Sequence, residues 1–198
     1  VQVGTRQLSF TGLPYAGVEI DLIAAAVPST TRLMNENFSR ASTIPQMDDH
    51  TVVHLATHAE FVSGQPEDSF ILFGNGDRVT LRDVATWSLR RVDLVVLSAC
   101  QTALGGELGN GEEIMGFGYQ IQRTGVRSAI ASLWSVDDGG TQALMTLFYQ
   151  RLQGHSLTKA EALRQAQLAL IQGTRPWSTG EMGQAPFPNQ SYDHPYYW

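Results

Sequence analysis

Cysteine is nearly absent from this sequence, since Cys100 is the only one among 198 residues. An intramolecular disulfide is therefore excluded, and either packing or chemistry must account for this single thiol. Long apolar runs are also lacking, because no stretch approaches the roughly 18 residues that span a bilayer. The chain does not open with the charged-then-apolar pattern of a signal sequence. These absences predict a cytoplasmic protein with no membrane partner.

Basic residues are too few and too scattered to bind a phosphate backbone. The chain carries 13 Lys and Arg against 19 Asp and Glu, which gives a net charge of −6, and it has no basic block. Contact with nucleic acid depends on clustered positive charge, so no nucleic-acid partner is expected. The glycine-rich run at residues 105–113 lacks the Lys-Ser/Thr ending of a phosphate-binding loop and is acidic. We expect a flexible loop there, and no cofactor.

Three segments have the composition of buried parallel strands. Residues 51–57, 93–98 and 126–133 are short apolar runs rich in Val, Ile and Leu, without polar alternation. Strands that are buried on both faces have this composition. Four helices are predicted by apolar spacings of three and four: after Pro14, between Glu112 and Gly125, up to Gly154, and from a capping box at Thr158 onward.

Alternating strands and helices predict an α/β fold, with a mostly parallel central sheet and helices on both faces. We expect a single domain over residues 1–198. Residues 60–68 and the segment from Gly173 onward fall outside this pattern and are predicted to be surface loops or extended chain. Because the sequence begins with Val1 rather than Met, we expect a fragment of a longer protein.

Polar side chains follow all three predicted strands. His58 comes directly after the first, Cys100 follows the second by two residues, and Asp137 and Asp138 follow the third after a short loop. In an open α/β sheet, ligands bind at the carboxyl ends of the strands. Neighbouring strands lie about 4.8 Å apart, so His58 and Cys100 can converge on one cleft. An imidazole beside a thiol is what nucleophilic thiol chemistry needs, because the thiolate attacks and the imidazole moves the proton.

Less specific interpretations of these residues stay open at this point. A lone cysteine in an apolar strand is often inert packing, and a histidine at a strand end is often structural. His54 lies inside the strand, where a hydrogen-bonded core histidine is expected. The i, i+4 spacing of His54 and His58 suits a zinc site only on a helix, since four residues of strand span roughly 13 Å. No metal site is predicted.

Four motifs together resemble one family. Residues 54–58 (HLATH), 97–102 (LSACQT), 132–138 (SLWSVDD) and 162–167 (ALRQAQ) resemble, in order and spacing, the CHAT family of caspase-like domains, which are often attached to tetratricopeptide repeats. The resemblance runs from about Leu13 to the end of the sequence. It implies a caspase-like three-layer sandwich and a peptidase of the clan that includes caspases, separases and gingipains.

The resemblance also implies roles for individual residues. His58 matches the family's catalytic histidine and Cys100 its nucleophile. In that fold, the backbone N–H groups of the nucleophile and of the residue after the histidine bind the developing oxyanion, and here these belong to Cys100 and Ala59. A glycine often follows the histidine, so Ala59 is a small departure. No third residue that would orient His58 is evident from the sequence.

Asp137 and Asp138 have two possible roles. The resemblance places them beside the cleft, where a carboxylate can receive a basic substrate side chain. An Asp pair before Gly139 and a helix is also good N-terminal capping chemistry. The sequence leaves these alternatives open.

The sequence as a whole favours a cysteine endopeptidase that cleaves protein substrates through an acyl-thioester on Cys100, with His58 as acid and base. The alternative is a non-catalytic caspase-like interaction or scaffold module of a repeat-containing protein. In either case we expect a regulatory repeat region or an activating protein as a partner.

Overall fold

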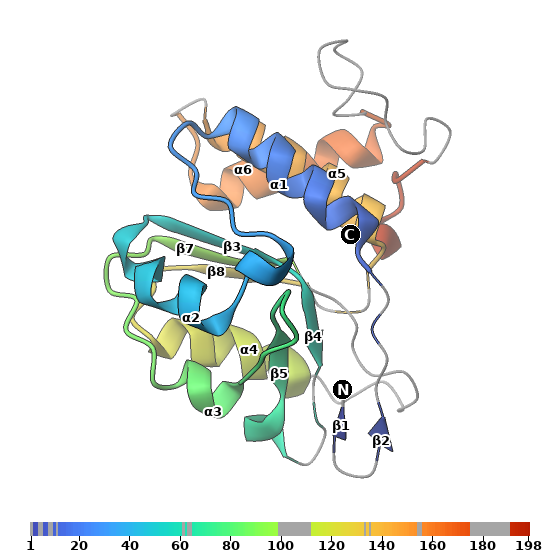
Figure 1. Cartoon of the computed structure of the whole chain (residues 1–198). Helices are drawn as coiled ribbons and strands as arrows, with labels where there is room; N and C mark the ends of the chain where they lie inside the picture. Colours follow the sequence, from blue (N-terminus) through green and yellow to red (C-terminus); the bar gives the residue numbers. More distant parts are fainter. Residues whose placement is uncertain are drawn as a thin grey trace. The chain divides into compact units, whose positions relative to one another are not determined.

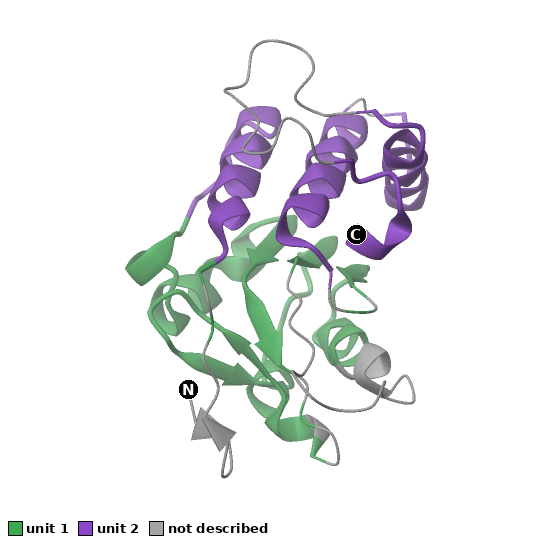
Figure 2. Cartoon of the chain, turned by 90° about the vertical axis from the view of Figure 1, so that its right-hand side faces the viewer, with its two compact units in different colours: residues 1–12, 33–135 green, residues 13–32, 136–198 purple. Residues whose placement is uncertain are grey.

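The computed structural model describes most of the chain. The described residues are 2–3, 6–7, 10, 12–60, 62, 65–98, 112–132, 134, 136–153, 156–174 and 191–198. They divide into two compact units, which Figure 2 shows in green and purple. The first unit comprises residues 1–12 and 33–135, and the second comprises residues 13–32 and 136–198.

A parallel sheet forms the centre of the first unit (Figure 1). Its strands are β3 (Val52–Ala56), β7 (Leu94–Ser98) and β8 (Ala129–Ala131), in the spatial order β3-β7-β8. Four of the five residues of the middle strand, β7, are fully buried, as expected for a strand with a neighbour on each side. All three strands lie within the predicted segments, so the parallel sheet was correctly predicted.

A second, antiparallel sheet was not predicted. It consists of β4 (His58–Glu60), β5 (Phe70–Leu72) and β6 (Arg78–Thr80), with β5 in the middle. The turn between β5 and β6 contains Gly76 at a φ of 89°, a backbone conformation that favours glycine. The prediction of loop or extended chain over residues 60–68 therefore missed Glu60, which belongs to β4. Two further short strands, β1 (Gln2–Val3) and β2 (Arg6–Gln7), pair with each other antiparallel.

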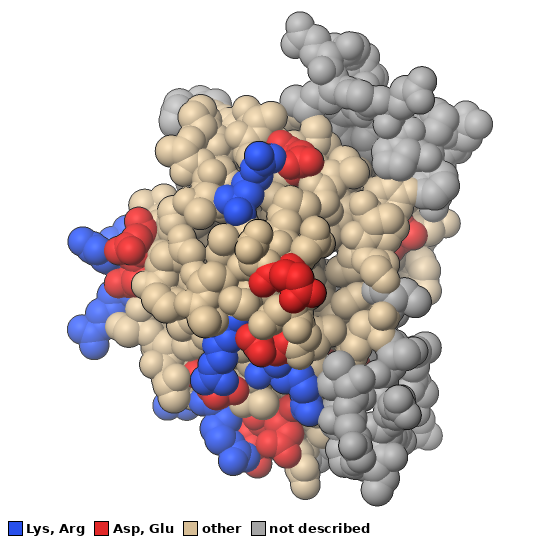
Figure 3. Space-filling view, viewed as in Figure 1, with Lys and Arg blue, Asp and Glu red and all other residues tan. Residues whose placement is uncertain are grey.

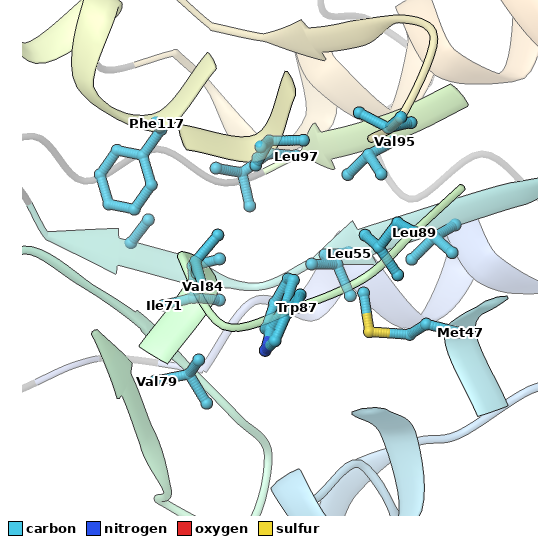
Figure 4. Packing of buried hydrophobic residues seen from close by; sticks show 14 of the residues in the cluster. Met47, Leu55, Ile71, Val79, Val84, Trp87, Leu89, Val95, Leu97 and Phe117 are labelled. Atoms are coloured by element: carbon cyan, nitrogen blue, oxygen red, sulfur yellow. The ribbon is translucent and has the colours of Figure 1, made fainter. Parts of the chain in front are cut away.

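Both sheets contribute to one hydrophobic core in the first unit. Figure 4 shows side chains from β3 and β7 meeting side chains from β5 and β6 and from two helices. These helices are α3 (Leu81–Val84) and α4 (Glu112–Arg123). Burial of each such side chain stabilises the fold by about 1.5–3 kcal/mol, so this core holds the two sheets together. Its labelled members are Met47, Leu55, Ile71, Val79, Val84, Trp87, Leu89, Val95, Leu97 and Phe117.

The helices of the first unit begin and end at recognisable signals. The one-turn helix α2 (Arg40–Thr43) begins at Ser39, whose side chain accepts a hydrogen bond from the backbone of Ser42. Helix α3 begins in the same way at Thr80. Helix α4 ends just before Gly125, whose φ of 101° stops the helix as predicted. Because α4 packs on β8, it lies against the parallel sheet.

Three helices build the second unit: α1 (Pro14–Ala26), α5 (Asp138–Leu152) and α6 (Lys159–Ile171). Helix α5 packs against both of the others. Its residues from Gly139 to Tyr149 are all buried, including the polar Thr141, Gln142 and Thr146. Helix α6 begins at Thr158, whose hydroxyl accepts the backbone N–H of Glu161 as the sequence predicts.

The C-terminal segment, residues 191–198, packs on the first turn of α5. It ends in a short 3₁₀ helix, η4 (Pro195–Tyr197). Two glycines make this close approach possible: a Cβ on Gly139 would lie 2.2 Å from the Tyr192 hydroxyl, and a Cβ on Gly140 would lie 2.2 Å from the carbonyl oxygen of Tyr197. The backbone N–H of Asp137 also donates to that Tyr197 oxygen, at 3.1 Å. The glycine pair is therefore a docking site for the tail.

Charged side chains of opposite sign lie near one another on the surface. In Figure 3, most of the basic groups on the visible face have acidic neighbours. Examples among the described residues are the ion pairs Arg40–Asp83, at 3.0 Å, and Arg164–Glu161, at 3.1 Å. Exposed pairs of this kind contribute at most about 1 kcal/mol each, so the core and not the surface charge dominates stability.

The mixed α/β class with a parallel sheet and flanking helices confirms the predicted fold class and agrees with a caspase-like fold. The single domain over residues 1–198 stays a prediction. None of the helices that the structure describes is both long and apolar enough to cross a membrane.

Candidate active site

His58 lies at the point where the chain passes from the parallel sheet to the antiparallel sheet. β3 ends at Ala56, one residue forms a bend, and His58 then begins β4. The sequence predicted that His58 directly follows its strand, whereas Thr57 separates the two. His58 is only 7% exposed and is the register partner of Leu72 in the antiparallel sheet. Its place beyond the carboxyl end of a parallel strand agrees with the prediction.

Thr57 is bonded to both sheets. Its backbone N–H donates to the carbonyl oxygen of Ser98, the last residue of β7, at 3.2 Å. Its side-chain hydroxyl donates to the carbonyl oxygen of Leu72 in β5. Thr57 is 7% exposed, so water competes little for these groups. The chain direction immediately before His58 is thus fixed by one bond to each sheet.

The direction of the backbone groups in β4 follows from the pairing of β5. In antiparallel strands, successive residues direct their N–H and C=O groups to opposite sides. The N–H of Phe73 donates to Asp77 at 2.8 Å, and the N–H of Leu81 donates to Ser69 at 2.8 Å. The backbone N–H and C=O groups of residues 69, 71 and 73 therefore point toward β6. It follows that the backbone N–H and C=O groups of Leu72 point toward β4.

This alternation determines the directions of the backbone N–H and C=O groups of His58 and Ala59. His58 is the register partner of Leu72, so its N–H and C=O face β5. Ala59, one residue later, directs its N–H away from β5. The β4–β5 ladder therefore does not use the N–H of Ala59, the group that the sequence analysis assigned to the oxyanion hole.

An aromatic ring lies beside the His58 imidazole. The ring centroids of Phe10 and His58 are 5.0 Å apart, and the two planes are tilted by 42°. Phe10 also meets Phe70 edge to face at 6.2 Å, and the guanidinium of Arg78 lies 4.1 Å from the centre of the Phe70 ring. Aromatic pairs of this geometry contribute about 0.5–1.5 kcal/mol beyond their burial. Phe10 therefore packs against the imidazole of His58.

Among the described residues, the contacts of Phe10 and Thr57 near His58 were not predicted. Thr57 is adjacent to a candidate catalytic residue, and its position just after an apolar strand was a usable signal. The contact between Phe10 and His58 joins positions that are 48 residues apart in the sequence, so no local sequence pattern predicts it.

Cys100 lies outside the described residues, and the strand that leads to it ends at Ser98. The pairing of β3 with β7 has a constant register, in which each residue of β3 lies opposite the residue 42 positions later: Val52 opposite Leu94, and Ala56 opposite Ser98. His54 lies within β3, opposite Val96, and is partly exposed.

Asp137 and Asp138 belong to the second unit, where both carboxylates bind helix termini. Asp137 caps α5 by accepting the backbone N–H of Gly140 at 2.9 Å. Asp138 accepts the backbone N–H of Tyr15, in the first turn of α1, at 2.9 Å. Burial, with further contributions from the neighbouring charges of Glu19 and Asp137, raises the pKa of Asp138 to about 6. The capping role considered for the pair is therefore observed for Asp137, and the substrate-pocket role stays a prediction.

Two tyrosines adjoin this acidic pair. Burial raises the pKa of the Tyr192 hydroxyl, and its hydrogen bond to Asp137 adds to the effect. Burial and the nearby Asp137 and Asp138 likewise raise the pKa of Tyr15. In the described part of the chain, no three His, Cys, Asp or Glu side chains are grouped as a metal site requires.

Comparison with known proteins identifies the family. Neither the curated proteins nor the solved structures contain a match to this chain. The family model described as the CHAT domain matches residues 2–198, which is almost the whole chain. This match agrees with the resemblance of the four sequence motifs and with the α/β fold. The chain therefore belongs to the CHAT domain family, whose domains are of the caspase-like peptidase type.

Proposed function

We propose that this chain is a cysteine endopeptidase in which Cys100 is the nucleophile and His58 transfers protons. The observation that supports the proposal most strongly is the register of β3 and β7. Cys100 is 42 positions after His58, which is the offset of every pair between the two strands. Ala56 and Ser98 end their strands opposite each other, so His58 and Cys100 are each two residues beyond adjacent strand ends, at the carboxyl edge where α/β sheets bind ligands.

The proposed reaction starts with transfer of the Cys100 thiol proton to the His58 imidazole. The thiolate attacks the carbonyl carbon of a peptide bond, and the carbonyl oxygen becomes an oxyanion. The C–N bond then breaks, His58 returns the proton to the departing amine, and an acyl-thioester on Cys100 remains. Water attacks the thioester as His58 accepts its proton. The carboxylic acid leaves, and the proton returns to the thiolate.

Backbone N–H groups stabilise the oxyanion in this proposal. The N–H of Ala59 is suited to this role because its direction, away from β5, keeps it out of the ladder that binds the backbone of His58. The second donor is the N–H of Cys100. Loss of one such donor typically lowers the rate by about 10²- to 10³-fold. The Phe10 ring packs against the His58 imidazole and makes that side of the histidine apolar.

The proposed chemistry makes the substrate a protein. The family resemblance, in which such domains are often attached to tetratricopeptide repeats, supports a regulatory repeat region or an activating protein as a partner. A cytoplasmic location suits a single free cysteine, because the thiol stays reduced there. A preference for Arg or Lys before the scissile bond is a separate prediction, since the helix contacts of Asp137 and Asp138 already account for both carboxylates without a substrate.

A peptide library incubated with four proteins tests the proposal. The native chain should cut, and Cys100→Ala should not, while both melt at the same temperature. His58→Ala should also be inactive, whereas the matched variant His54→Ala keeps its activity and mainly loses stability. Equal cleavage by the native chain and Cys100→Ala would contradict the proposal. No cleavage by the native chain would favour the alternative, a caspase-like interaction or scaffold module.

A further inference from the structure

We propose that Thr57 is the positioning residue for His58, a role for which the sequence offered no candidate. This inference rests on the proposed function, because it assigns Thr57 to the same proton-transfer step. The observation is that the two hydrogen bonds of Thr57 go to two different sheets, immediately before the histidine. Thr57 does not touch the substrate and acts only through His58.

Thr57 is the one residue of chain that connects β3 to β4. β3 ends at Ala56 and β4 begins at His58, so the chain changes from a parallel to an antiparallel sheet within one residue. The backbone N–H of Thr57 bonds the parallel sheet, and its hydroxyl adds a bond to the antiparallel sheet at the residue before His58. Because Thr57 is bonded on both sides, the direction in which His58 leaves the parallel sheet is fixed.

Both acceptors belong to strands that control the proposed pair. Leu72 is the residue opposite His58 in the β4–β5 ladder, so the hydroxyl of Thr57 holds the register partner of His58. Ser98 is the last residue of β7 and precedes Cys100 by two positions. Thr57 therefore links the strand that carries the base to the strand that leads to the nucleophile.

The hydroxyl group is the part of Thr57 that a substitution can remove. Every residue except proline supplies the backbone N–H that donates to Ser98, but only Thr or Ser also supplies a short side-chain donor for the Leu72 carbonyl. Thr57→Val keeps the branched shape and loses this donor, and Thr57→Ser keeps the donor. Misplacement of a catalytic group by about 1 Å can lower the rate by about 10²-fold.

Thr124 provides a matched control within the same unit. Its hydroxyl also donates to a backbone carbonyl, that of Ile121, at 2.6 Å, and it is 5% exposed. Thr124 follows α4 and precedes β8, so it lies toward the amino edge of the parallel sheet, opposite the edge where β3 ends. Thr124→Val thus removes the same kind of bond from the same core without touching the connection to His58.

The test measures cleavage of the library peptides and the imidazole NMR signal of His58 in each variant. Thr57→Val should lower kcat by about 10- to 100-fold with KM nearly unchanged, and the His58 signal should broaden or double. Thr57→Ser should restore both readouts. Thr124→Val should lower the melting temperature about as much as Thr57→Val and leave kcat and the His58 signal as in the native chain. Thr57→Ala, which also lacks the hydroxyl, replaces Thr57→Val if that variant does not fold.

Two results would overturn the role of Thr57 while the proposed function stands: a kcat for Thr57→Val within about twofold of the native value, or equal losses of kcat in Thr57→Val and Thr124→Val. If the native chain cuts nothing, the proposed function fails separately, and the NMR signal still decides on positioning. A single sharp His58 signal in Thr57→Val then overturns the inference, and a broadened or doubled signal supports it.

Discussion

Replacing Asp137 by alanine should destabilise the chain by about 2 kcal/mol. The carboxylate accepts the N–H of Gly140 at the start of α5, and loss of such a cap costs about 1 kcal/mol. It also accepts the hydroxyl of Tyr192 from the C-terminal segment, and a bond of this kind adds about another 1 kcal/mol. For a chain of this size, the sum corresponds to a melting temperature lower by about 4–8 °C.

Urea denaturation of the native chain, Asp137→Ala and Asp137→Asn measures this directly. Asparagine is as good a cap as aspartate and still accepts the tyrosine hydroxyl, so Asp137→Asn should stay within about 0.5 kcal/mol of the native value. Equal destabilisation by both substitutions would refute the capping argument. Because asparagine keeps the cap and removes the charge, a peptide profile of Asp137→Asn also tests the pocket. Loss of a preference for Arg or Lys without loss of stability would assign the carboxylate to substrate recognition.

Three further predictions concern the described residues. Burial raises the pKa of Asp138 to about 6, above about 3.9 in the unfolded chain, so the folded state binds the proton more tightly. The contribution of Asp138 to stability is therefore most favourable below about pH 4 and is lost as the pH rises to about 6. Between these pH values, the stability of the native chain relative to Asp138→Asn should fall by about 1 kcal/mol, after allowance for partial exposure. A stability difference between the two proteins that stays constant with pH would contradict this. Gly140→Ala should displace the tail, because its Cβ would meet the Tyr197 carbonyl at 2.2 Å; faster proteolysis of residues 191–198 checks this, and unchanged protection would count against it. Phe10→Ala should uncover His58, which is 7% exposed, so that diethyl pyrocarbonate modifies it faster in peptide mapping; an unchanged rate would show that Phe10 does not shield it.

Local sequence patterns predicted the parallel sheet and the long helices but not the antiparallel sheet. The runs at β3 and β7 are each five residues of mostly apolar chain, which is long enough to indicate burial on both faces. Strand β8 is only three residues long but lies within the longer predicted run 126–133. Strands β4, β5 and β6 are three residues each and lie outside the three predicted runs. They form because they pair with one another and share the core around Ile71 and Val79.

In the candidate site, too, some features could be predicted from neighbouring residues and others depend on distant segments. His58 was predictable because it follows a strand, which is a property of neighbouring residues. The packing of the Phe10 ring and the bond from Thr57 to Leu72 depend on how distant segments meet. The two roles considered for Asp137 needed the structure, because only the observed bond to Gly140 identifies a cap.

Covalent labelling with a peptide that carries a thiol-reactive electrophile is the sharpest test of Cys100 and His58 as a catalytic pair. We expect one adduct, located on Cys100 by mass spectrometry, that forms rapidly in the native chain and is absent from Cys100→Ala. His58→Ala should slow labelling by at least about 10²-fold, because the thiol then loses its base, while His54→Ala should label at nearly the native rate. Labelling of Cys100 at the same rate in the native chain and in His58→Ala would contradict the proposed pair.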